Sequence, residues 1–278
     1  MSRRPVPAAD LGPRVTEHGG AGNVDWCLLV DQARPGWENM AIDSALLDLA
    51  EADGSAFLRL YSWAPHCLSF GRNEPAKRRY DGERITALGL DCVRRPTGGR
   101  AVWHARELTY AVAAPLSALG GLKQAYHTLH DMLARALSAF GTAPLLAPRA
   151  APVAGLHSGP CFATPIGGEV LIDGLKVVGS AQLRQGDAFL QHGSVLLDDD
   201  QSLVRMLAGL SEAAAAEAPL SRLVGRAVTF AEVADAIAAS ARGILPGLGS
   251  GASLPPAARY RVSRHAERFR SAEWTWQR

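Results

Sequence analysis

In the first part of the chain, segments whose hydrophobic residues have the spacing of a strand lie on both sides of a segment whose hydrophobic residues have the spacing of a helix. The apolar run at residues 26–30 predicts a buried strand. A helix is expected from Asn39, its N-cap, to about Gly54. The apolar stripe of this helix consists of Ile42, Ala45, Leu46 and Leu49. Residues 57–61 alternate as in a half-buried strand, and residues 67–71 predict its neighbour.

The middle of the chain continues this mixture and contains the clearest helix. Residues 77–87 are charged and predict a helix, whereas residues 90–95 and 108–112 predict strands. Helical spacing of apolar residues then extends from 122 to 140 and stops at Gly141. We expect this long helix to cover one face of a sheet.

Two turn signals predict an antiparallel meander over residues 169–197. Asp173-Gly174 lies between apolar runs and is typical of a two-residue hairpin, and Gln185-Gly186-Asp187 marks a second turn. Short helices are expected at 203–210 and 230–239.

The helix at 230–239 begins with a capping box, in which Thr229 precedes Glu232 by three residues. Strands and helices are mixed along the chain without regular βαβ alternation. The predicted fold class is therefore α+β.

Composition divides the chain into three segments. Residues 1–23 are rich in Pro, Gly, Ala and charge and predict a flexible N-terminal arm. Residues 24–246 form the expected folded domain. Residues 247–278 begin with a linker and continue as a basic helix and tail, which we expect to dock on that domain.

Size and charge exclude several classes of function. The chain has 278 residues and 47% hydrophobic content, enough for a large core. It lacks an apolar run of membrane-spanning length, and its N-terminus lacks the apolar core of a signal peptide, so we expect a cytoplasmic protein without membrane contact. A net charge of +2 with scattered basic residues disfavours nucleic-acid binding.

Four cysteines and three lysines are the residues most informative about chemistry. Cys27, Cys67 and Cys92 have apolar neighbours and are interpreted as buried thiols, whereas Cys161 lies in a Gly/Pro loop, 158–162. The cysteines lack the spacing of a zinc site or a disulfide framework. Arginine supplies most of the positive charge, which draws attention to Lys176, because lysine exchanges protons more readily than arginine.

Several blocks in order resemble a known family, the lipoate and octanoate members of the biotin/lipoate protein ligase superfamily. The blocks are residues 38–43, 58–63, 95–104, 107–110, 173–182 and 190–194. The chain is most similar to octanoyltransferases that carry their nucleophilic cysteine in the loop before the lysine strand. The resemblance implies that 24–246 is a ligase-like catalytic domain, with a mixed, largely antiparallel sheet flanked by helices.

The same resemblance implies a reaction and its partners. An octanoyl group would move from octanoyl-acyl carrier protein to the lysine of a lipoyl-domain protein, such as glycine cleavage H protein, through a thioester on a cysteine. No cofactor and no metal are expected, and we expect a monomer. Two other enzymes remain open, an ATP-dependent lipoate-protein ligase and an amidotransferase that moves octanoyl groups between lipoyl domains. A non-catalytic module that only captures a lipoyl domain is a third alternative.

Cys161 and Lys176 are the predicted catalytic residues. A free thiol is largely protonated at neutral pH, so a nearby cation is needed to stabilise the thiolate. The resemblance implies that Lys176 is this cation. Whether it also takes and returns a proton is left open. His157, four residues before Cys161, is a less favoured partner for the thiol.

A set of polar and small residues is predicted to bind substrate. These residues are Arg95, Thr97, Gly98, Gly99, Arg100, His104, Gly179, Ser180 and His192. Backbone N–H groups at 98–99 or 179–180 are candidates to bind the oxyanion, because small residues permit close approach. Arg94 is interpreted as a surface charge. The candidates for an apolar slot that holds the octanoyl chain are Val102, Trp103, Val178 and Leu190.

Overall fold

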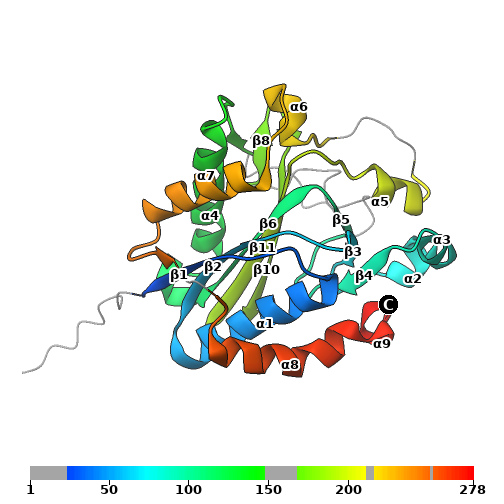
Figure 1. Ribbon diagram of the computed structural model, residues 1–278, viewed down its shortest axis with the longest axis horizontal. Coiled ribbons are helices and arrows are strands. Elements are labelled where there is room, and N and C mark those ends of the chain that lie inside the picture. The colour runs from blue at the N-terminus through cyan, green and yellow to red at the C-terminus, as the bar shows by residue number, and fades with distance from the viewer. Residues whose placement is uncertain (1–23, 148–167, 211–215, 251–252) are drawn as a thin grey trace, which may run out of the picture.

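A computed structural model describes residues 24–147, 168–210, 216–250 and 253–278 (Figure 1). The predicted N-terminal arm, 1–23, and Cys161 lie outside the described residues, as does His157. None of the described helices is both long enough and apolar enough to cross a membrane.

The largest sheet has six strands in the order β10-β11-β6-β2-β1-β12. β1 is parallel to both of its neighbours, and the remaining pairs are antiparallel. The strands are β1 (Trp26–Val30), β2 (Ala56–Tyr61), β6 (Glu107–Pro115), β10 (Val178–Gln185), β11 (Ala188–Leu196) and β12 (Gly249–Ser250). The sheet is therefore mixed and largely antiparallel, which confirms the predicted fold class.

Two three-stranded sheets adjoin the large one. One has the order β4-β3-β5 and the other β7-β8-β9. Their strands are β3 (Cys67–Phe70), β4 (Asp91–Arg94), β5 (Val102–His104), β7 (Leu145–Leu146), β8 (Val170–Ile172) and β9 (Leu175–Lys176).

These small sheets correct two predictions about strand pairing. Residues 67–71 do not pair with 57–61, because β1 and β6 already occupy both edges of β2. The meander at 169–197 is divided between two sheets. The β8–β9 hairpin forms as predicted, with Asp173 and Gly174 at positive φ. After Val177 the chain enters the large sheet as β10.

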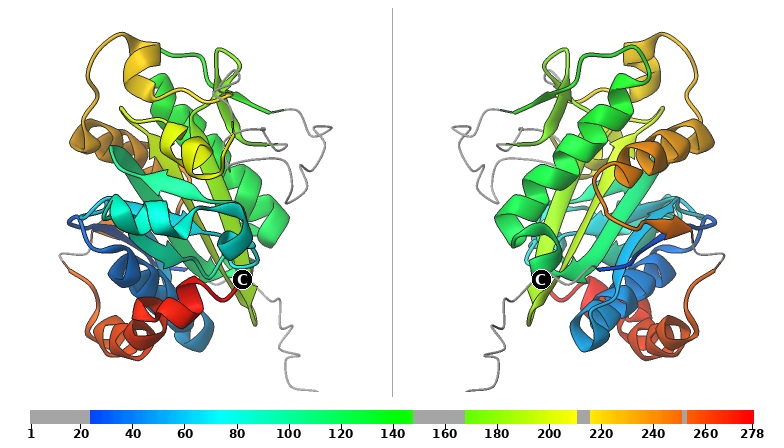
Figure 2. Two further views of the ribbon diagram at one scale, coloured as in Figure 1. Left: turned by 90° about the vertical axis from the view of Figure 1, so that its right-hand side faces the viewer. Right: turned by 90° about the vertical axis from the view of Figure 1, so that its left-hand side faces the viewer.

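Helices cover both faces of the large sheet (Figure 2). On one face lie α4 (Leu122–Ser138) and α7 (Phe230–Arg242), which pack against each other. On the other face lies α1 (Gly36–Asp53), and α8 (Pro256–Arg270) packs along it. The predicted long helix and the predicted capping box of α7 are both confirmed.

The beginning of α1 differs from the prediction. The helix starts at Gly36, and Asn39 lies inside it rather than at its N-cap. A Cβ at position 36 would lie 2.5 Å from the Cys67 sulfur, so glycine lets the helix begin against β3. The Asn39 amide donates to the carbonyl groups of Arg34 and Ser62, which joins the start of the helix to the end of β2.

The remaining helices are short. The described ones are α2 (Ala76–Arg79), α3 (Gly82–Ala87), the 3₁₀ helix η1 (Leu116–Leu119), α5 (Ser202–Leu207), α6 (Leu220–Val224) and α9 (Ala272–Thr275). The helix predicted at 77–87 is divided because Asp81 accepts a hydrogen bond from the backbone N–H of Arg84 and starts a new helix there.

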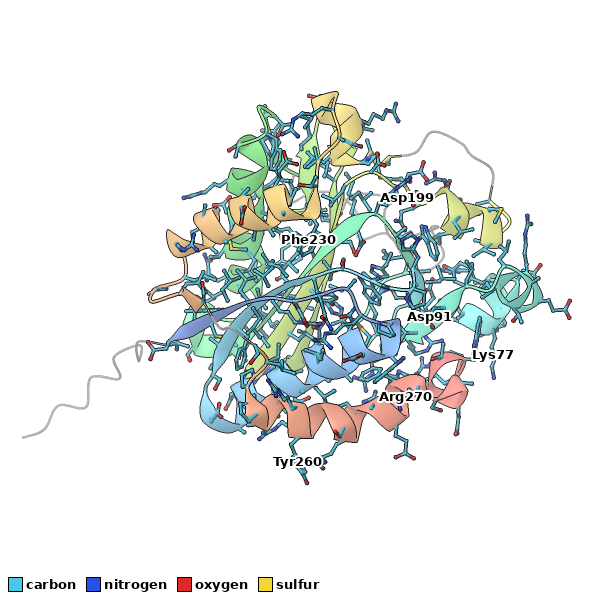
Figure 3. All side chains as sticks on the ribbon, viewed as in Figure 1. Lys77, Asp91, Asp199, Phe230, Tyr260 and Arg270 are labelled. Atoms are coloured by element: carbon cyan, nitrogen blue, oxygen red, sulfur yellow. The ribbon has the colours of Figure 1, made fainter. Side chains whose placement is uncertain are left out.

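Arg94 is fully buried, which contradicts its interpretation as a surface charge. Its guanidinium donates to the carbonyl groups of Gly71 and Glu74, at 2.7 and 2.9 Å, and to that of Thr275 at 3.0 Å. These carbonyl acceptors, which the sequence pattern does not reveal, bind Nε and Nη1 of the guanidinium and offset part of the cost of burying its charge. Arg94 thereby joins α9 to the loop after β3. From the adjoining α8, Tyr260 points away from the protein (Figure 3).

All six residues of β2 are buried, so the half-buried strand predicted there is wrong. Arg59 occupies a buried position because two carboxylates neutralise it. Its guanidinium lies 2.8 Å from Asp31 and 2.9 Å from Asp43, and Tyr61 donates to the same Asp43 at 2.8 Å. These groups tie β2 to α1.

Replacing Arg59 by Met should lower the free energy of unfolding by ~3–5 kcal/mol, because Asp43 would stay buried without its guanidinium partner. Urea unfolding measures this change. Arg184→Met is the matched control, since its ion pair with Asp187 is largely exposed and should contribute little. Equal losses in the two variants would contradict this account.

Candidate active site

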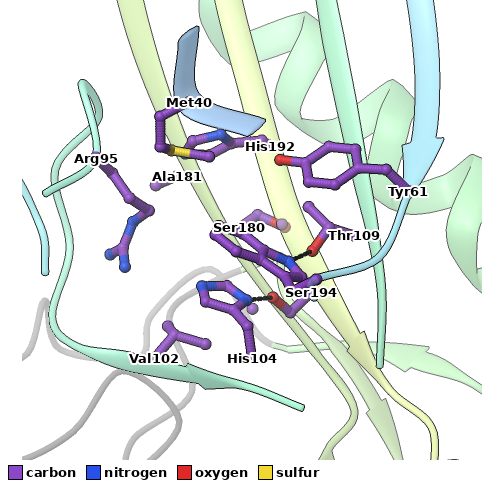
Figure 4. A pocket seen from close by; sticks show the side chains of 13 residues that line it. Met40, Tyr61, Arg95, Val102, His104, Thr109, Ser180, Ala181, His192 and Ser194 are labelled. Carbon is purple, nitrogen blue, oxygen red and sulfur yellow. Dashed lines mark hydrogen bonds between the residues drawn. The ribbon is translucent and has the colours of Figure 1, made fainter. Parts of the chain in front are cut away.

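A pocket lies between the large sheet and the small sheet β4-β3-β5 (Figure 4). It contains about 330 Å³ of space outside the protein atoms, part of it open to solvent. The lining residues are Met40, Tyr61, Trp63, Arg95, Val102, His104, Thr109, Gly179, Ser180, Ala181, His192, Gly193 and Ser194. Five of the predicted binding residues therefore reach the pocket: Arg95, His104, Gly179, Ser180 and His192.

His104 forms part of the pocket wall, but both of its ring nitrogens already have partners. Nε2 lies 2.6 Å from the Ser69 hydroxyl, and Nδ1 lies 2.9 Å from the Glu107 carboxylate. The ring stacks on Trp63 with 3.9 Å between centroids. Burial lowers the pKa of His104 despite the opposing effect of Glu107, so the ring is neutral at neutral pH. His104 contributes a flat, uncharged surface to the pocket.

Arg95 also lines the pocket, yet its donors are used within the protein. The guanidinium donates to the carbonyl groups of Ser69, Gly98 and Arg100. It therefore holds the loop of residues 96–100 against β3. We call this segment the glycine loop.

The glycine loop also depends on a glycine outside it, Gly71, whose role the sequence interpretation missed. A Cβ at Gly71 would lie 1.9 Å from the carbonyl oxygen of Gly99, so only glycine permits this approach. Gly99 has a φ of +90°, a conformation that glycine adopts without strain. Gly98, Gly99, Thr97 and the buried Arg100 lie in the loop beside the pocket rather than among its lining residues.

His192 links the glycine loop to α1. Its Nε2 lies 2.7 Å from the Thr97 hydroxyl, and its Nδ1 lies 3.0 Å from the Asp43 carboxylate. Because Asp43 also binds Arg59, the loop, the helix and β2 share one buried network. Thr97 and His192 are thus brought together, in a structural contact that the sequence did not predict.

Ser180 lines the pocket from β10 and belongs to another network behind the wall. Its hydroxyl lies 2.7 Å from the Tyr110 hydroxyl and 2.9 Å from His130 Nε2. Burial lowers the pKa of His130 to about 4, and the nearby Lys176 ammonium adds to this effect. Lys176 and the Ser180 network therefore influence each other electrostatically.

Lys176, the predicted catalytic lysine, is fully buried on β9. Its Nζ lies 2.7 Å from the Glu169 carboxylate, which is itself only 1% exposed. Among the described residues, neither member of this pair lines the pocket. Only Val177 separates β9 from β10, and β10 supplies Gly179, Ser180 and Ala181 to the pocket wall.

Two of the described cysteines, Cys67 and Cys92, are unreactive because of their surroundings. Burial raises the pKa of Cys67 well above that of a free thiol and raises the pKa of Cys92 to about 12. Thiols of this kind stay protonated at neutral pH. Cys161 lies outside the described residues. In the part of the chain that is described, no group of three or more His, Cys, Asp or Glu side chains is arranged to hold a metal ion.

The predicted octanoyl slot is only partly correct. Val102 lines the pocket, but Val178 and Leu190 are fully buried in the hydrophobic cores on the two faces of the large sheet. Trp103 packs instead against a core next to β3. The apolar part of the pocket is formed with Met40, Tyr61 and Trp63, which come from α1 and from the end of β2.

The family model of the lipoyl protein ligase A/B catalytic domain matches residues 35–242, three quarters of the chain. The chain belongs to this family. The resemblance found in the sequence is thereby confirmed. The matched region contains every described residue of the pocket, and α8 and α9 lie beyond it.

Two relatives align over most of their length. The octanoyltransferase LipM of Symbiobacterium thermophilum is 38% identical over 233 residues, which cover 77% of this chain and 84% of that protein. The octanoyltransferase LipM of Exiguobacterium sibiricum is 33% identical over 276 residues, 91% of this chain and 99% of that protein.

Solved structures support the fold. Lipoate-protein ligase A bound with ATP superposes with a TM-score of 0.77 at 17% identity, covering 91% of this chain and 99% of that one. A bipartite lipoate protein ligase of Thermoplasma acidophilum gives a TM-score of 0.72, also at 17% identity, covering 91% and 96%. The ligase-like fold predicted from the sequence is confirmed.

Glu169, the buried partner of Lys176, was missed by the sequence interpretation, although the hairpin contains a signal for it. The turn at 173–174 sets Leu171 opposite Lys176. Glu169 is two residues from Leu171 on the same face, and diagonal neighbours in a hairpin can touch. Tyr110 and His130 give no such signal, because long stretches of chain separate them from Ser180.

Acid should destabilise the protein partly through His130. Below pH ~6.5 the unfolded chain protonates this residue, whereas the folded protein does not until about pH 4. The free energy of unfolding should therefore fall by ~1 to 2 kcal/mol per pH unit between these values. His130→Gln removes this dependence. The free energy of unfolding of the unmodified protein should therefore fall relative to that of His130→Gln as the pH is lowered.

Urea unfolding at intervals from pH 7.5 to 4.5 measures the difference between the two proteins. The value at pH 7.5 gives the baseline, since His130 is neutral there in both states. If the difference in free energy of unfolding between the two proteins stays constant down to pH 4.5, His130 is not held neutral by burial.

Proposed function

We propose that this protein is an octanoyltransferase that acts through an acyl-enzyme. It takes the octanoyl group of octanoyl-acyl carrier protein, holds it as a thioester on Cys161, and passes it to the lysine of a lipoyl domain such as that of glycine cleavage H protein. Family membership supports this proposal, as do relatives named octanoyltransferases that align over most of both chains.

The proposed reaction has two half-reactions. In the first, the Cys161 sulfur bonds to the octanoyl carbonyl carbon while the bond from this carbon to the carrier's sulfur breaks, and the carrier leaves as a thiol. In the second, the lysine nitrogen bonds to the same carbon and the Cys161 sulfur leaves. Exchange between two thioesters is nearly isoenergetic, so the acyl group stays activated until the amine arrives.

The observation that carries the proposal is the buried ion pair of Lys176 and Glu169 on the hairpin that leads into the pocket wall. A buried lysine exchanges protons more readily than an arginine does. Cys161 has to lose a proton before the first half-reaction and regain one after the second. We assign two roles to Lys176: its ammonium stabilises the thiolate while the thiol proton passes to the sulfur of the departing carrier, and in the second half-reaction it relays a proton from the attacking amine to the Cys161 sulfur.

The glycine loop is the proposed source of donors for the tetrahedral intermediate. Arg95 and Gly71 hold this loop beside the pocket, where a Cβ on Gly99 would lie 4.0 Å from that of Ala181. Backbone N–H groups in a fixed loop stabilise an oxyanion without reorganisation, and the loss of one such donor typically costs ~10²–10³ in rate.

Acyl carrier protein is acidic, and α8 offers it a basic surface. Arg264, Arg268 and Arg270 are exposed on this helix. The guanidinium groups of Arg268 and Arg270 stack over Trp274 and Trp37, at 3.5 and 3.7 Å from the ring centroids, which fixes their charges in place. We propose this face as the docking site of the carrier, with an association that weakens as salt rises.

Incubation with octanoyl-acyl carrier protein and no nucleotide should add one octanoyl group to Cys161. Intact-mass and peptide spectra detect it, and hydroxylamine should remove it. Cys161→Ser should abolish the thioester, whereas Cys92→Ser should keep it, because the Cys92 thiol has a pKa of about 12.

Other outcomes of this experiment identify the alternatives. Dependence on ATP with release of pyrophosphate, unaffected by Cys161→Ser, would indicate a ligase. Acylation by octanoylated H protein but not by the carrier would indicate an amidotransferase. Binding of a lipoyl domain without any adduct or turnover would indicate a capture module.

A double substitution separates the catalytic role of Lys176 from the stability of its ion pair. Lys176→Met alone should cost ~3–5 kcal/mol of stability, because it removes the ammonium that faces the buried Glu169 carboxylate. Lys176→Met with Glu169→Gln removes both charges and should recover most of this loss.

The rate of Cys161 acylation should nevertheless stay ~10²–10⁴-fold low in the double variant, the usual contribution of a proton-transfer group. Stopped-flow acylation and urea unfolding on the same samples provide the comparison. Recovery of the rate together with the stability would show that Lys176 is only structural.

A further inference from the structure

A chain of hydrogen bonds runs behind the pocket wall, and both of its ends lie on α4. At one end, Gln182 Nε2 lies 3.0 Å from the carbonyl oxygen of Leu122 and 2.8 Å from Gln191 Oε1. A carbonyl oxygen can only accept, so it fixes which atom of the Gln182 amide is the nitrogen. Gln191 is then oriented as well, and its Nε2 donates to the Tyr110 hydroxyl at 2.8 Å.

The other end of the chain fixes the tautomer of His130. Its Nδ1 lies 2.8 Å from the carbonyl oxygen of Tyr126, so Nδ1 carries the proton. The ring is neutral at neutral pH, because burial lowers the pKa of His130 to about 4. Nε2 is therefore an acceptor, and the Ser180 hydroxyl donates to it at 2.9 Å.

Tyr110 and Ser180 complete the chain in one direction. Tyr110 accepts from Gln191 and donates its own proton to Ser180 Oγ at 2.7 Å. Burial raises the pKa of Tyr110 to about 12, so this proton is present at neutral pH. The donors thus run from Gln182 through Gln191, Tyr110 and Ser180 to His130.

The direction of donation along this chain decides whether Ser180 can donate a hydrogen bond to a ligand or only accept one. The residue is only half-buried and lines the pocket, but its proton is committed to His130. The oxygen has a lone pair that remains for the pocket. Ser180 is therefore a hydrogen-bond acceptor toward a ligand and not a donor to an oxyanion.

Gly193 on the adjacent strand makes room for this arrangement. A Cβ at position 193 would lie 2.6 Å from Ser180 Oγ and 2.9 Å from a ring carbon of Tyr110. Any side chain there would displace one of the two hydroxyls. The pairing of β10 with β11 at Gly193 therefore leaves the space that the two hydroxyls occupy.

We propose that Ser180 accepts a hydrogen bond from the attacking amine of the acceptor lysine and thereby orients the lone pair of the amine nitrogen for attack. This inference rests on the proposed function and concerns its second half-reaction. A thioester group has only acceptor atoms at its carbonyl, whereas the amine brings N–H donors that match an acceptor in the wall. The N–C bond forms as the C–S bond to Cys161 breaks, and one amine proton ends on the sulfur.

His130 is the positioning residue in this arrangement, because it acts through Ser180. Without an acceptor at position 130 the Ser180 hydroxyl can rotate and present its proton to the pocket, where it would repel an N–H group. Glutamine at this position has both an acceptor for Ser180 and a donor for the Tyr126 carbonyl, while phenylalanine has neither.

Single-turnover kinetics separate the two half-reactions. The first rate is the acylation of Cys161 by octanoyl-acyl carrier protein, and the second is the transfer from purified acyl-enzyme to a lipoyl domain. Ser180→Ala and His130→Phe should each slow the second rate by ~10- to 100-fold, as expected for a lost orienting contact, and change the first less than twofold. His130→Gln should keep both rates.

Ser138→Ala, on the exposed side of α4, is the matched serine control and should change neither rate. Thermal melting of each variant checks that it is folded, and the first rate serves as an internal measure of an intact pocket. Equal slowing of both half-reactions by Ser180→Ala would overturn the proposal in favour of a donor to both oxyanions. An unchanged second rate in Ser180→Ala, or a faster one in His130→Phe, would also overturn it.

Failure of this inference is distinct from failure of the proposed function. Should the unmodified protein form no acyl-enzyme, the octanoyl relay is refuted and the role of Ser180 with it. Normal acylation of Cys161 together with an unaffected transfer rate in Ser180→Ala refutes the role of Ser180 alone.

Discussion

A lysine ammonium without exposed surface requires a partner of opposite charge, and the Glu169 carboxylate lies 2.7 Å from Lys176. Burying the two charges separately would be far more costly than burying them as a pair. The pair fixes the β8–β9 hairpin from which β10 enters the large sheet and lines the pocket. The chemistry assigned to Lys176 therefore takes place on an element that the ion pair itself stabilises.

Because a buried polar group needs a partner, the polar residues around the pocket mostly bind one another. Arg95 holds the glycine loop, His104 stands between Ser69 and Glu107, and His192 joins Thr97 to Asp43. A substrate meets a wall whose polar side chains are already oriented. Such a wall suits an octanoyl group, which is apolar along its chain and offers only acceptor atoms at its carbonyl, because few side chains have to reorganise when it binds.

Local patterns predicted much of this fold, and contacts distant in sequence account for the errors. The helix at 122–140 and the hairpin at 173–174 follow from spacing and turn residues, and the ordered motifs identified the family. Arg59 and Arg94 were misjudged because the acceptors that let them be buried come from other elements. His130 was missed for the same reason. The hydrophobic slot predicted from strand residues is only partly correct, because Val102 lines the pocket whereas Val178 and Leu190 face the cores.

The central claim is that the Lys176 ammonium makes the Cys161 thiolate available. The pH dependence of Cys161 alkylation by iodoacetamide, followed by peptide mass, tests it directly in proteins with and without the Lys176→Met and Glu169→Gln pair of substitutions. The account predicts that Cys161 titrates below the ~8.5 of a free thiol when Lys176 is present and that the double substitution raises this value. A Cys161 that titrates at or above ~8.5 in both proteins would contradict it.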